Sequence, residues 1–304
     1  MKIITNTRHK MNCSYDTSNI RLKFADNSHI GVAHCCYKEK ELVNIKSFDE
    51  IYKMSNDDFW NYLQQSYKMI PNNHNYEPAY YCNTTQKCYY NDKYIDKIAV
   101  SLFRHCNLNC KMCLVSSNNF LSLEESKKIY FDVLYKVKGH NLSQIGLTQN
   151  GEPFLCKKET FDYLESLTVN DFKNIDIVTN VLLLNDDDIL KLANIKKNIN
   201  ITIMASCSGI TPETYSSIHC NNKFDKVINN IKKLHDSKLL SSISYVIQNE
   251  NLHELPFIVD FWKNMNIHTT VYFHPIIGSN GPQIVKMKEY LEFKKKYPSE
   301  CVNI

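Results

Sequence analysis

From residue 97 onward, apolar runs of strand length alternate with amphipathic stretches of helix length, and this alternation limits the fold more than any other feature of the sequence. The predicted strands cover about 97–103, 143–148, 174–179, 199–206, 241–248 and 268–274. The predicted helices cover about 122–137, 157–168, 185–197, 223–237, 253–265 and 283–296. Strands that alternate with helices form a parallel sheet with right-handed crossovers. Six such units predict an α/β fold, a partial (βα)6 barrel.

Two of the predicted helices begin with capping sequences. Ser122 is followed three residues later by Glu125, which is the pattern of a capping box. Asn185 precedes Asp186, Asp187 and Asp188, whose charges suit the positive end of a helix dipole. These starts support the alternation of strands and helices.

Three cysteines follow the first predicted strand at close spacing. Cys106, Cys110 and Cys113 are separated by three and then two residues. Thiolates bind soft metal centres, and cysteine sulfur holds iron–sulfur clusters. Three thiolates can hold three irons of a 4Fe–4S cube and leave the fourth iron open to another ligand. A zinc site is the alternative, although structural zinc sites usually combine two cysteine pairs, or one pair with two histidines.

Polar or otherwise special residues also follow the other predicted strands. In parallel α/β folds, sites gather at the carboxyl ends of the strands. The clusters are Thr148 to Pro153, Thr179-Asn180, Ser206 to Gly209, Gln248-Asn249 and His274-Pro275. Together with the cysteine trio at the first strand, they predict one site at this edge of the sheet.

The trio after a strand, CxxxCxxC, resembles the signature of the radical S-adenosylmethionine (radical SAM) superfamily. In that family the open iron of a 4Fe–4S cluster binds the amine and carboxylate of S-adenosylmethionine (SAM). One electron then cleaves SAM to methionine and a 5′-deoxyadenosyl radical, which abstracts hydrogen from a substrate. The resemblance implies that Cys106, Cys110 and Cys113 hold this cluster, and that a flavodoxin or ferredoxin supplies the electron.

Three further segments resemble landmarks of this superfamily. Gln149 to Pro153 is similar to the GGEP motif, which contacts the amino group of SAM, with asparagine in place of the first glycine. Ile177 to Asn180 is similar to the start of a TNG motif, and Val181 stands where glycine is usual. Ser206 to Gly209 is similar to SxDG, whose polar side chains lie near the ribose, with serine in place of aspartate. The resemblance implies SAM-binding roles for Gln149, Asn150, Gly151, Glu152, Asn180, Ser206, Ser208 and, on the adenine side, Gln248.

The first 96 residues carry five further cysteines, Cys13, Cys35, Cys36, Cys82 and Cys88. Residues 20–24 and 30–34 predict a hairpin around a turn at 26–29, and residues 47–65 predict a helical region. Small buried cysteines or a zinc site are the plainer interpretations of these thiols.

This layout is similar to the auxiliary-cluster domains called SPASM and twitch, in which cysteines around a hairpin and a helix hold a second iron–sulfur cluster. It departs from them in two ways. The segment precedes the radical SAM domain, and the closing pair, Cys82 and Cys88, is wider than CxxC. The resemblance implies an auxiliary-cluster domain over 1–96, a radical SAM partial barrel over 97–282, and a C-terminal helix and tail over 283–304.

Cys207 and Cys220 lie near the predicted site and are candidate hydrogen donors. A thiol can donate a hydrogen atom to a substrate radical because its S–H bond is weak, and radical SAM epimerases use such a cysteine. The alternative for each is a small buried residue without a catalytic role.

Composition and charge narrow the function further. The net charge of +4 is small and scattered over 304 residues, which disfavours nucleic acid and anionic membranes as partners. No apolar run reaches the ~18 residues of a membrane span, and no apolar core of a signal peptide follows the N-terminal basic residues. Twelve cysteines then favour metal or redox use in the cytoplasm over disulfides.

Together these features predict a radical SAM enzyme of the oxidoreductase or epimerase type, with a second iron–sulfur cluster as a further cofactor. The expected substrate is a peptide or a small metabolite such as a sugar or an aminocyclitol. An acceptor cluster favours oxidation or crosslinking, whereas a donor thiol favours epimerisation. The alternative is a non-catalytic scaffold of the same fold that binds an iron–sulfur cluster or zinc.

Overall fold

The computed structural model describes residues 19–33, 42–69, 94–113, 121–147, 150–275, 287–296 and 301–303. Its strands are β1 (Asn19–Phe24), β2 (His29–Ala33), β3 (Val43–Ser47), β4 (Lys97–Ser101), β5 (Leu142–Leu147), β6 (Phe172–Thr179), β7 (Asn200–Ser206), β8 (Leu240–Ile247), β9 (Thr270–Pro275) and β10 (Cys301–Asn303). Its α-helices are α1 (Phe48–Lys53), α2 (Asn56–Met69), α3 (Leu123–Lys136), α4 (Lys157–Glu165), α5 (Asp186–Ile195), α6 (Pro212–His219), α7 (Phe224–Asp236), α8 (Ile258–Asn264) and α9 (Met287–Lys296). Two short 3-10 helices are η1 (Pro153–Cys156) and η2 (Asn249–Glu254).

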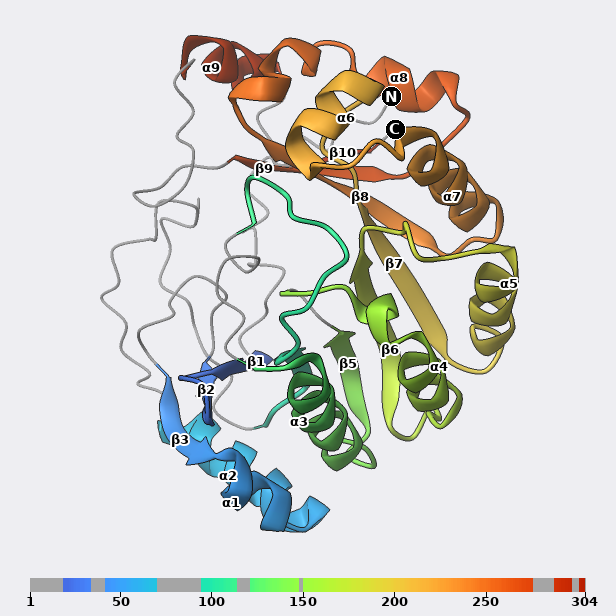
Figure 1. The fold of residues 1–304 in the computed structure, drawn as a ribbon. Coiled ribbons are helices and arrows are strands. Elements are labelled where there is room, and N and C mark those ends of the chain that lie inside the picture. Colours follow the sequence, from blue (N-terminus) through green and yellow to red (C-terminus); the bar gives the residue numbers. More distant parts are fainter. Residues whose placement is uncertain are drawn as a thin grey trace.

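The six predicted barrel strands correspond to β4 through β9 and form a parallel sheet. They lie side by side in chain order, and every neighbouring pair among them is parallel. Figure 1 shows the sheet curving around one side of the molecule, as an open barrel does. The predicted α/β partial barrel is therefore confirmed, with the carboxyl ends of its strands at one edge.

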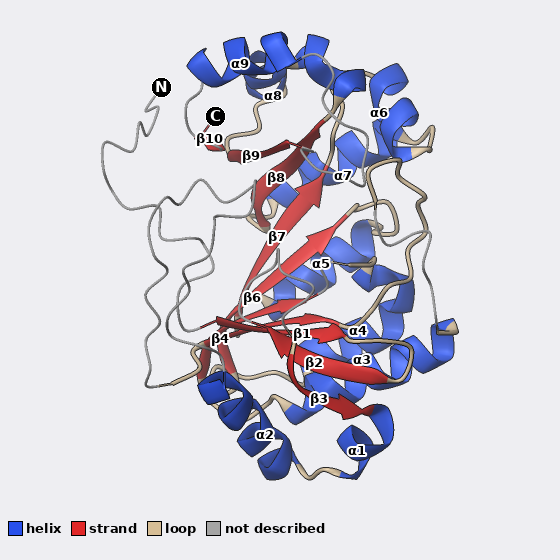
Figure 2. Ribbon diagram, turned by 90° about the vertical axis from the view of Figure 1, so that its left-hand side faces the viewer, coloured by secondary structure: helices blue, strands red, loops and turns tan. Residues whose placement is uncertain are grey.

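The helices that connect these strands cover one face of the sheet. In Figures 1 and 2, α3, α4, α5 and α7 lie along the same side of the strands. Alternate residues of β6 and β7 are fully buried and belong to the hydrophobic core, namely Ile175, Ile177, Ile201 and Ile203. Burial of each such side chain stabilises the fold by about 2 kcal/mol. This packing fixes which face of each strand is turned away from the helices.

The face turned away from the helices is half-buried and largely polar. The Asp176 carboxylate of β6 accepts hydrogen bonds from the Gln144 amide of β5 and from the Thr202 hydroxyl of β7. Strands of a parallel sheet that are buried on both faces usually read as continuous apolar runs. The inner face of this sheet is polar and only half-buried, so it is suited to line a space that holds polar ligands.

The structure corrects several predicted boundaries. The helical region predicted at 47–65 is two helices, because Ser55 caps a new one, accepting from Asp58 N at 3.1 Å. The helix predicted at 253–265 begins only at Ile258, since Pro256 lacks the N–H that a continuous helix needs. Strand β3, helix α6 and strand β10 were not predicted.

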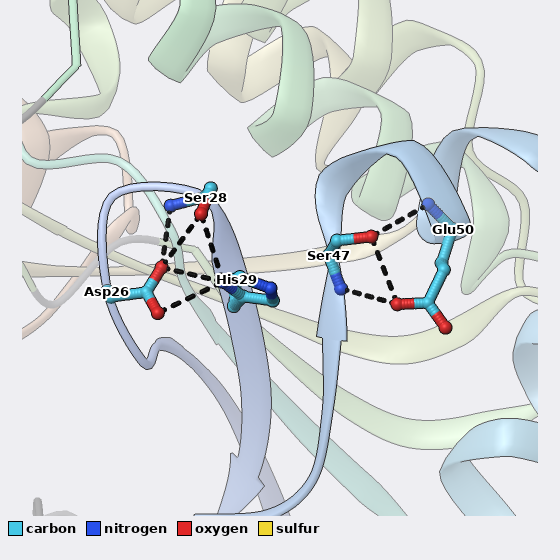
Figure 3. Close-up of polar contacts among 5 residues, drawn as sticks. All are labelled: Asp26, Ser28, His29, Ser47 and Glu50. Atoms are coloured by element: carbon cyan, nitrogen blue, oxygen red, sulfur yellow. Dashed lines mark hydrogen bonds and ion pairs between the residues drawn. The ribbon is translucent and has the colours of Figure 1, made fainter.

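The N-terminal hairpin is confirmed and continues the barrel sheet. β1 pairs with β2 antiparallel and with β4 in parallel, so the sheet crosses the predicted domain boundary at residue 96. Figure 3 shows two groups of hydrogen bonds in this region, one at the hairpin turn and one at the start of α1. At the hairpin turn, the Asp26 carboxylate accepts a hydrogen bond from Ser28 N at 2.8 Å and also bonds to the ring of His29. These two bonds lower the pKa of the carboxyl to about 2. Ser47 and Glu50 form a capping box that starts α1.

In the described part of the chain, no helix is both long enough and apolar enough to cross a bilayer.

Helix α7 ends in a Schellman motif that places a lysine in the left-handed region. Lys238 has φ 57°, while Lys238 N bonds to His235 O and Leu239 N bonds to Leu234 O, both at 2.9 Å. Because left-handed backbone costs a non-glycine residue about 1 kcal/mol or more, we expect Lys238→Gly to raise the free energy of unfolding by about 1 kcal/mol.

Urea unfolding measures this effect. Lys232→Gly is the matched control, because Lys232 is exposed within α7 and glycine should there lower stability by about 1 kcal/mol. If both substitutions lower stability, the assignment of strain to Lys238 is wrong.

Candidate cluster and SAM site

The cysteine trio lies on the loop that leaves β4 at the carboxyl edge of the barrel sheet. Cys106 is exposed, Cys110 and Cys113 are half-buried, and all three thiols are free of disulfides. Leu108 is buried and its backbone N–H donates to Cys106 Sγ at 3.4 Å. Cys113 N bonds to Cys110 O at 3.0 Å, so the last two cysteines share one turn. We call residues 102–113 the cluster loop.

The chain after β5 packs directly against the cluster loop at Gly151. Glu152 N donates to His105 O at 2.9 Å. A Cβ on Gly151 would lie 2.5 Å from Phe103 O and 2.8 Å from His105 O. Only glycine fits this close approach of two backbones. The neighbouring Asn150 is half-buried, whereas the predicted Gln149 lies outside the described residues.

The Glu152 carboxylate is buried between the ends of β5 and β6. Its Oε1 accepts from Phe154 N at 3.1 Å and from Thr179 Oγ1 at 2.7 Å, and its Oε2 accepts from Asn180 N at 2.9 Å. Burial raises the pKa of this carboxyl to about 7, even though the three hydrogen bonds act in the opposite direction. Within the described chain, Glu152 therefore ties the two strand ends together, and contact with SAM stays a prediction for it.

Asn180 connects the end of β6 to the first cysteine of the cluster loop. Its side-chain Nδ2 donates to Asn107 Oδ1 at 2.9 Å and lies 3.6 Å from Cys106 Sγ. Its Oδ1 accepts from Leu182 N at 3.0 Å. A predicted SAM ligand thus lies against a predicted cluster ligand, which places two separate sequence motifs in one site.

Val181 adopts the backbone conformation that a glycine would adopt without strain. Its φ of 59° lies in the left-handed region, where a β-branched residue is rare. Asn230 of α7 holds this turn, since its Nδ2 donates to Val181 O at 2.8 Å and to Leu184 O at 3.0 Å. The substitution of valine for the glycine of the motif therefore keeps the shape of the turn.

The residues after β7 are held mainly by other parts of the chain. Ser206 is half-buried at the strand end. Cys207 is fully buried and its thiol donates to Gly209 O at 3.3 Å, and burial raises its pKa to about 12. The Ser208 hydroxyl accepts from Val246 N at 3.0 Å and is also fully buried. Both side chains have partners within the chain, so the hydrogen-donor role of Cys207 and the ribose contact of Ser208 stay predictions.

Gln248 is a fully buried amide at the end of β8 with unused hydrogen-bonding capacity. Within the described chain, neither its Oε1 nor its Nε2 has a hydrogen-bond partner. Its backbone N–H donates to Asn251 Oδ1 at 2.9 Å, which fixes where the side chain starts. A buried amide without partners costs about 1–3 kcal/mol per group, so this side chain is ready to pair with a polar ligand.

Helix α6 carries a residue that the sequence reasoning missed. His219 is buried, its Nδ1 lies 3.3 Å from Cys110 Sγ, and its Nε2 accepts from Ser208 N at 3.0 Å. Burial lowers the pKa of His219 to about 4 and raises that of Cys110 to about 12. The sequence does carry a signal for the start of this helix. Thr211 is a capping residue, and Pro212 stands at the first helical position.

Cys220 directly follows His219. It is exposed and caps α6 with φ 51°. No described contact tests its predicted role as a hydrogen donor. The candidate auxiliary-cluster ligands Cys13, Cys35, Cys36, Cys82 and Cys88 all lie outside the described residues.

The residues at this edge fit an iron–sulfur cluster with a small organic ligand beside it. Three free thiols lie on one loop, and that loop rests on a glycine that admits no side chain. Farther along the same edge of the sheet, at the end of β8, lies a buried amide that has no partner among the described residues. Among the described residues, no three Cys, His, Asp or Glu side chains are grouped closely enough to ligate a single metal ion. The fold and the site together define a class of parallel partial barrels that present a cysteine trio after the first barrel strand.

Comparison with known proteins identifies the family. Residues 100–261, more than half of the 304-residue chain, match the Radical SAM superfamily. The chain therefore belongs to the radical SAM superfamily. Membership implies a 4Fe–4S cluster and S-adenosylmethionine as cofactors.

Individual relatives are distant. A probable GTP 3′,8-cyclase of Saccharolobus islandicus is 25% identical over 207 residues, which are 65% of this chain and 65% of the relative. The sporulation killing factor maturation protein SkfB of Bacillus subtilis is 27% identical over 168 residues, 54% of this chain and 39% of the relative. The chain thus spans less than two thirds of the length of these curated relatives.

A solved structure agrees in fold. Native anSMEcpe with bound AdoMet aligns with a TM-score of 0.50 and 17% identity, over 66% of this chain and 58% of that one. At this identity the likeness concerns the fold alone.

Proposed function

We propose that this chain is a radical SAM enzyme whose cluster is held by Cys106, Cys110 and Cys113. The observation that carries the proposal is the contact between Asn180 and the cluster loop, at 3.6 Å from Cys106 Sγ. This contact brings the cysteine trio together with a second motif of the family, from a different strand. Chance resemblance of either motif would not produce it.

Each side chain has a task in this proposal. When bound, the cluster and SAM supply the chemistry of the family, in which one electron from an external donor cleaves SAM and 5′-deoxyadenosine forms with a hydrogen from the substrate. Asn180 orients Cys106, and Gly151 lets the segment after β5 approach the cluster loop. The Gln248 amide, which has no partner among the described residues, offers N–H donors and a carbonyl acceptor to the adenine edge of SAM.

The substrate is a peptide or a small polar metabolite. The polar inner face of the barrel, with Asp176 between Gln144 and Thr202, supports a substrate that offers hydrogen-bonding groups. The two relatives differ in kind, one being named a GTP 3′,8-cyclase and the other a killing factor maturation protein. The proposal covers oxidation, crosslinking and epimerisation.

A second iron–sulfur cluster in the first 96 residues is part of the proposal. Its candidate ligands are Cys13, Cys35, Cys36, Cys82 and Cys88. An auxiliary cluster would accept an electron from the substrate radical and favour oxidation or crosslinking. A reduced flavodoxin or ferredoxin in the cytoplasm would supply the electron for SAM cleavage.

The proposal predicts the outcome of removing the trio. In anaerobically reconstituted protein, Cys106→Ala/Cys110→Ala/Cys113→Ala should lose about four irons per chain and all 5′-deoxyadenosine formation from SAM with dithionite. The measurements are iron content and chromatographic detection of 5′-deoxyadenosine. Cys156→Ala is the control, because Cys156 is a buried thiol outside the site.

Three other outcomes would change the assignment. Iron without 5′-deoxyadenosine in the parent protein would favour the non-catalytic scaffold. Zinc in place of iron would reject the cluster altogether. About four irons in the parent and none in the triple variant would remove the auxiliary cluster and favour redox-neutral chemistry.

A further inference from the structure

His219 lies between the cluster loop and the end of β7. Its side chain is buried, and its two ring nitrogens face different partners. Nδ1 lies 3.3 Å from Cys110 Sγ, while Nε2 lies 3.0 Å from Ser208 N. The ring also stacks on Tyr215, with centroids 4.5 Å apart and planes 23° apart. These contacts hold the imidazole in one orientation.

The partner on Nε2 decides where the imidazole proton lies. The Ser208 backbone N–H is a donor and cannot accept, so Nε2 must offer its lone pair and carries no proton. A neutral imidazole then carries its single proton on Nδ1. Nδ1–H points to Cys110 Sγ, and the Ser208 backbone thus makes His219 a hydrogen-bond donor to sulfur.

The same helix fixes the cluster loop in place. Lys111 N donates to Ile218 O at 2.9 Å, and Lys111 Nζ lies 3.3 Å from Ser217 Oγ. The residue that follows Cys110 is therefore tied to the two residues that precede His219, which keeps the sulfur close to the imidazole.

We infer that His219 is a positioning residue that donates a hydrogen bond to the ligating sulfur of Cys110 and raises the reduction potential of the cluster. The inference rests on the proposed cluster at the cysteine trio. Hydrogen bonds to cluster sulfurs withdraw electron density and so stabilise the reduced state. Partners that orient a metal ligand typically contribute 10–100-fold to metal affinity or activity.

The test is a redox titration of reconstituted protein, followed by the electron paramagnetic resonance signal that SAM alters and that the triple cysteine variant lacks. His219→Phe keeps a ring against Tyr215 but removes both nitrogens. We expect its equilibrium constant for one-electron reduction to fall about tenfold, which corresponds to about 59 mV for one electron. We also expect its cluster to lose iron faster to a chelator than that of the parent.

Two further variants separate the sulfur contact from the contact with Ser208. The amide nitrogen of His219→Asn can occupy the position of Nδ1, so this variant should keep the parent potential within about twofold in that equilibrium constant. His219→Gln can accept from Ser208 N but places no donor near Nδ1, so it should shift like His219→Phe. Ser216→Ala is the matched control on the same helix, because Ser216 has no described contact with the cluster loop, and it should leave the potential unchanged.

These outcomes distinguish a failure of the proposed function from a failure of the inference about His219. If the parent lacks the SAM-sensitive signal, the proposed function fails before His219 is tested. If the parent shows it and His219→Gln titrates at the parent potential, the inference about His219 is wrong. If His219→Phe does not load, the comparison of His219→Gln with His219→Asn still decides, and equal shifts in both would overturn the inference.

Discussion

Replacing Gly151 by alanine should abolish cluster loading and lower the free energy of unfolding by about 3 kcal/mol or more. The added Cβ would meet Phe103 O at 2.5 Å and His105 O at 2.8 Å. Both are backbone atoms at the base of the cluster loop, so neither can move aside as a flexible side chain would. The clash would push this loop away and also weaken the bond from Glu152 N to His105 O.

Gly146→Ala provides the matched control for this substitution. Gly146 lies in β5, a few residues before Gly151, and a Cβ there would meet its nearest atom, Ala99 Cβ, at an ordinary 3.7 Å. We expect this variant to bind iron and to unfold like the parent protein, within about 1 kcal/mol. Iron content and urea unfolding measure both effects. A Gly151→Ala variant that loads a full cluster would show that the close approach has no role in holding the loop.

The stability of the cluster-free protein should depend on pH through Glu152. Burial raises the pKa of this carboxyl from 4.5 to about 7. Between these values the folded protein keeps a proton that the unfolded chain has released, so stability falls as the pH rises. The contribution is complete below pH 4.5 and is lost by about pH 7, with a total of about 3 kcal/mol.

Glu152→Gln isolates this effect, because glutamine does not titrate. Relative to the parent, the variant should gain about 3 kcal/mol in unfolding free energy as the pH rises from about 4.5 to about 7. Urea unfolding at several pH values in this window measures the difference. Glu213→Gln, which removes an exposed carboxylate on α6, is the control. Parallel pH profiles for the parent and Glu152→Gln would mean that Glu152 stays ionised in the folded protein.

The barrel could be predicted from the sequence because its signals are local. Each strand from β4 to β9 carries apolar residues over a strand's length, and capping residues mark α3 and α5. Strand β3 and helix α6 were missed, since both are short and partly polar. The parallel pairing of β1 with β4 could not be foreseen either, because it joins segments that are far apart in the sequence.

The strand-end motifs predict a site at one edge of the sheet, but they do not predict the contacts within it. Asn180 does lie against the cluster loop, as two motifs of one site would. Sequence spacing could not show that the Ser208 hydroxyl is used by Val246 N, or that His219 reaches Cys110. Those partners come from other strands and helices, so they depend on tertiary packing and not on any local pattern.

The parallel pairing of β1 with β4 affects where this chain can be cut into fragments. β4 delivers the cluster loop, and β1 occupies its outer edge along five residue pairs from Asn19–Lys97 to Lys23–Ser101. A fragment that starts at residue 97 would leave those backbone groups open to water and to other chains, as unprotected sheet edges are. The barrel therefore shares its sheet with the polypeptide that precedes it, and β1 covers the edge strand that carries the cysteine trio.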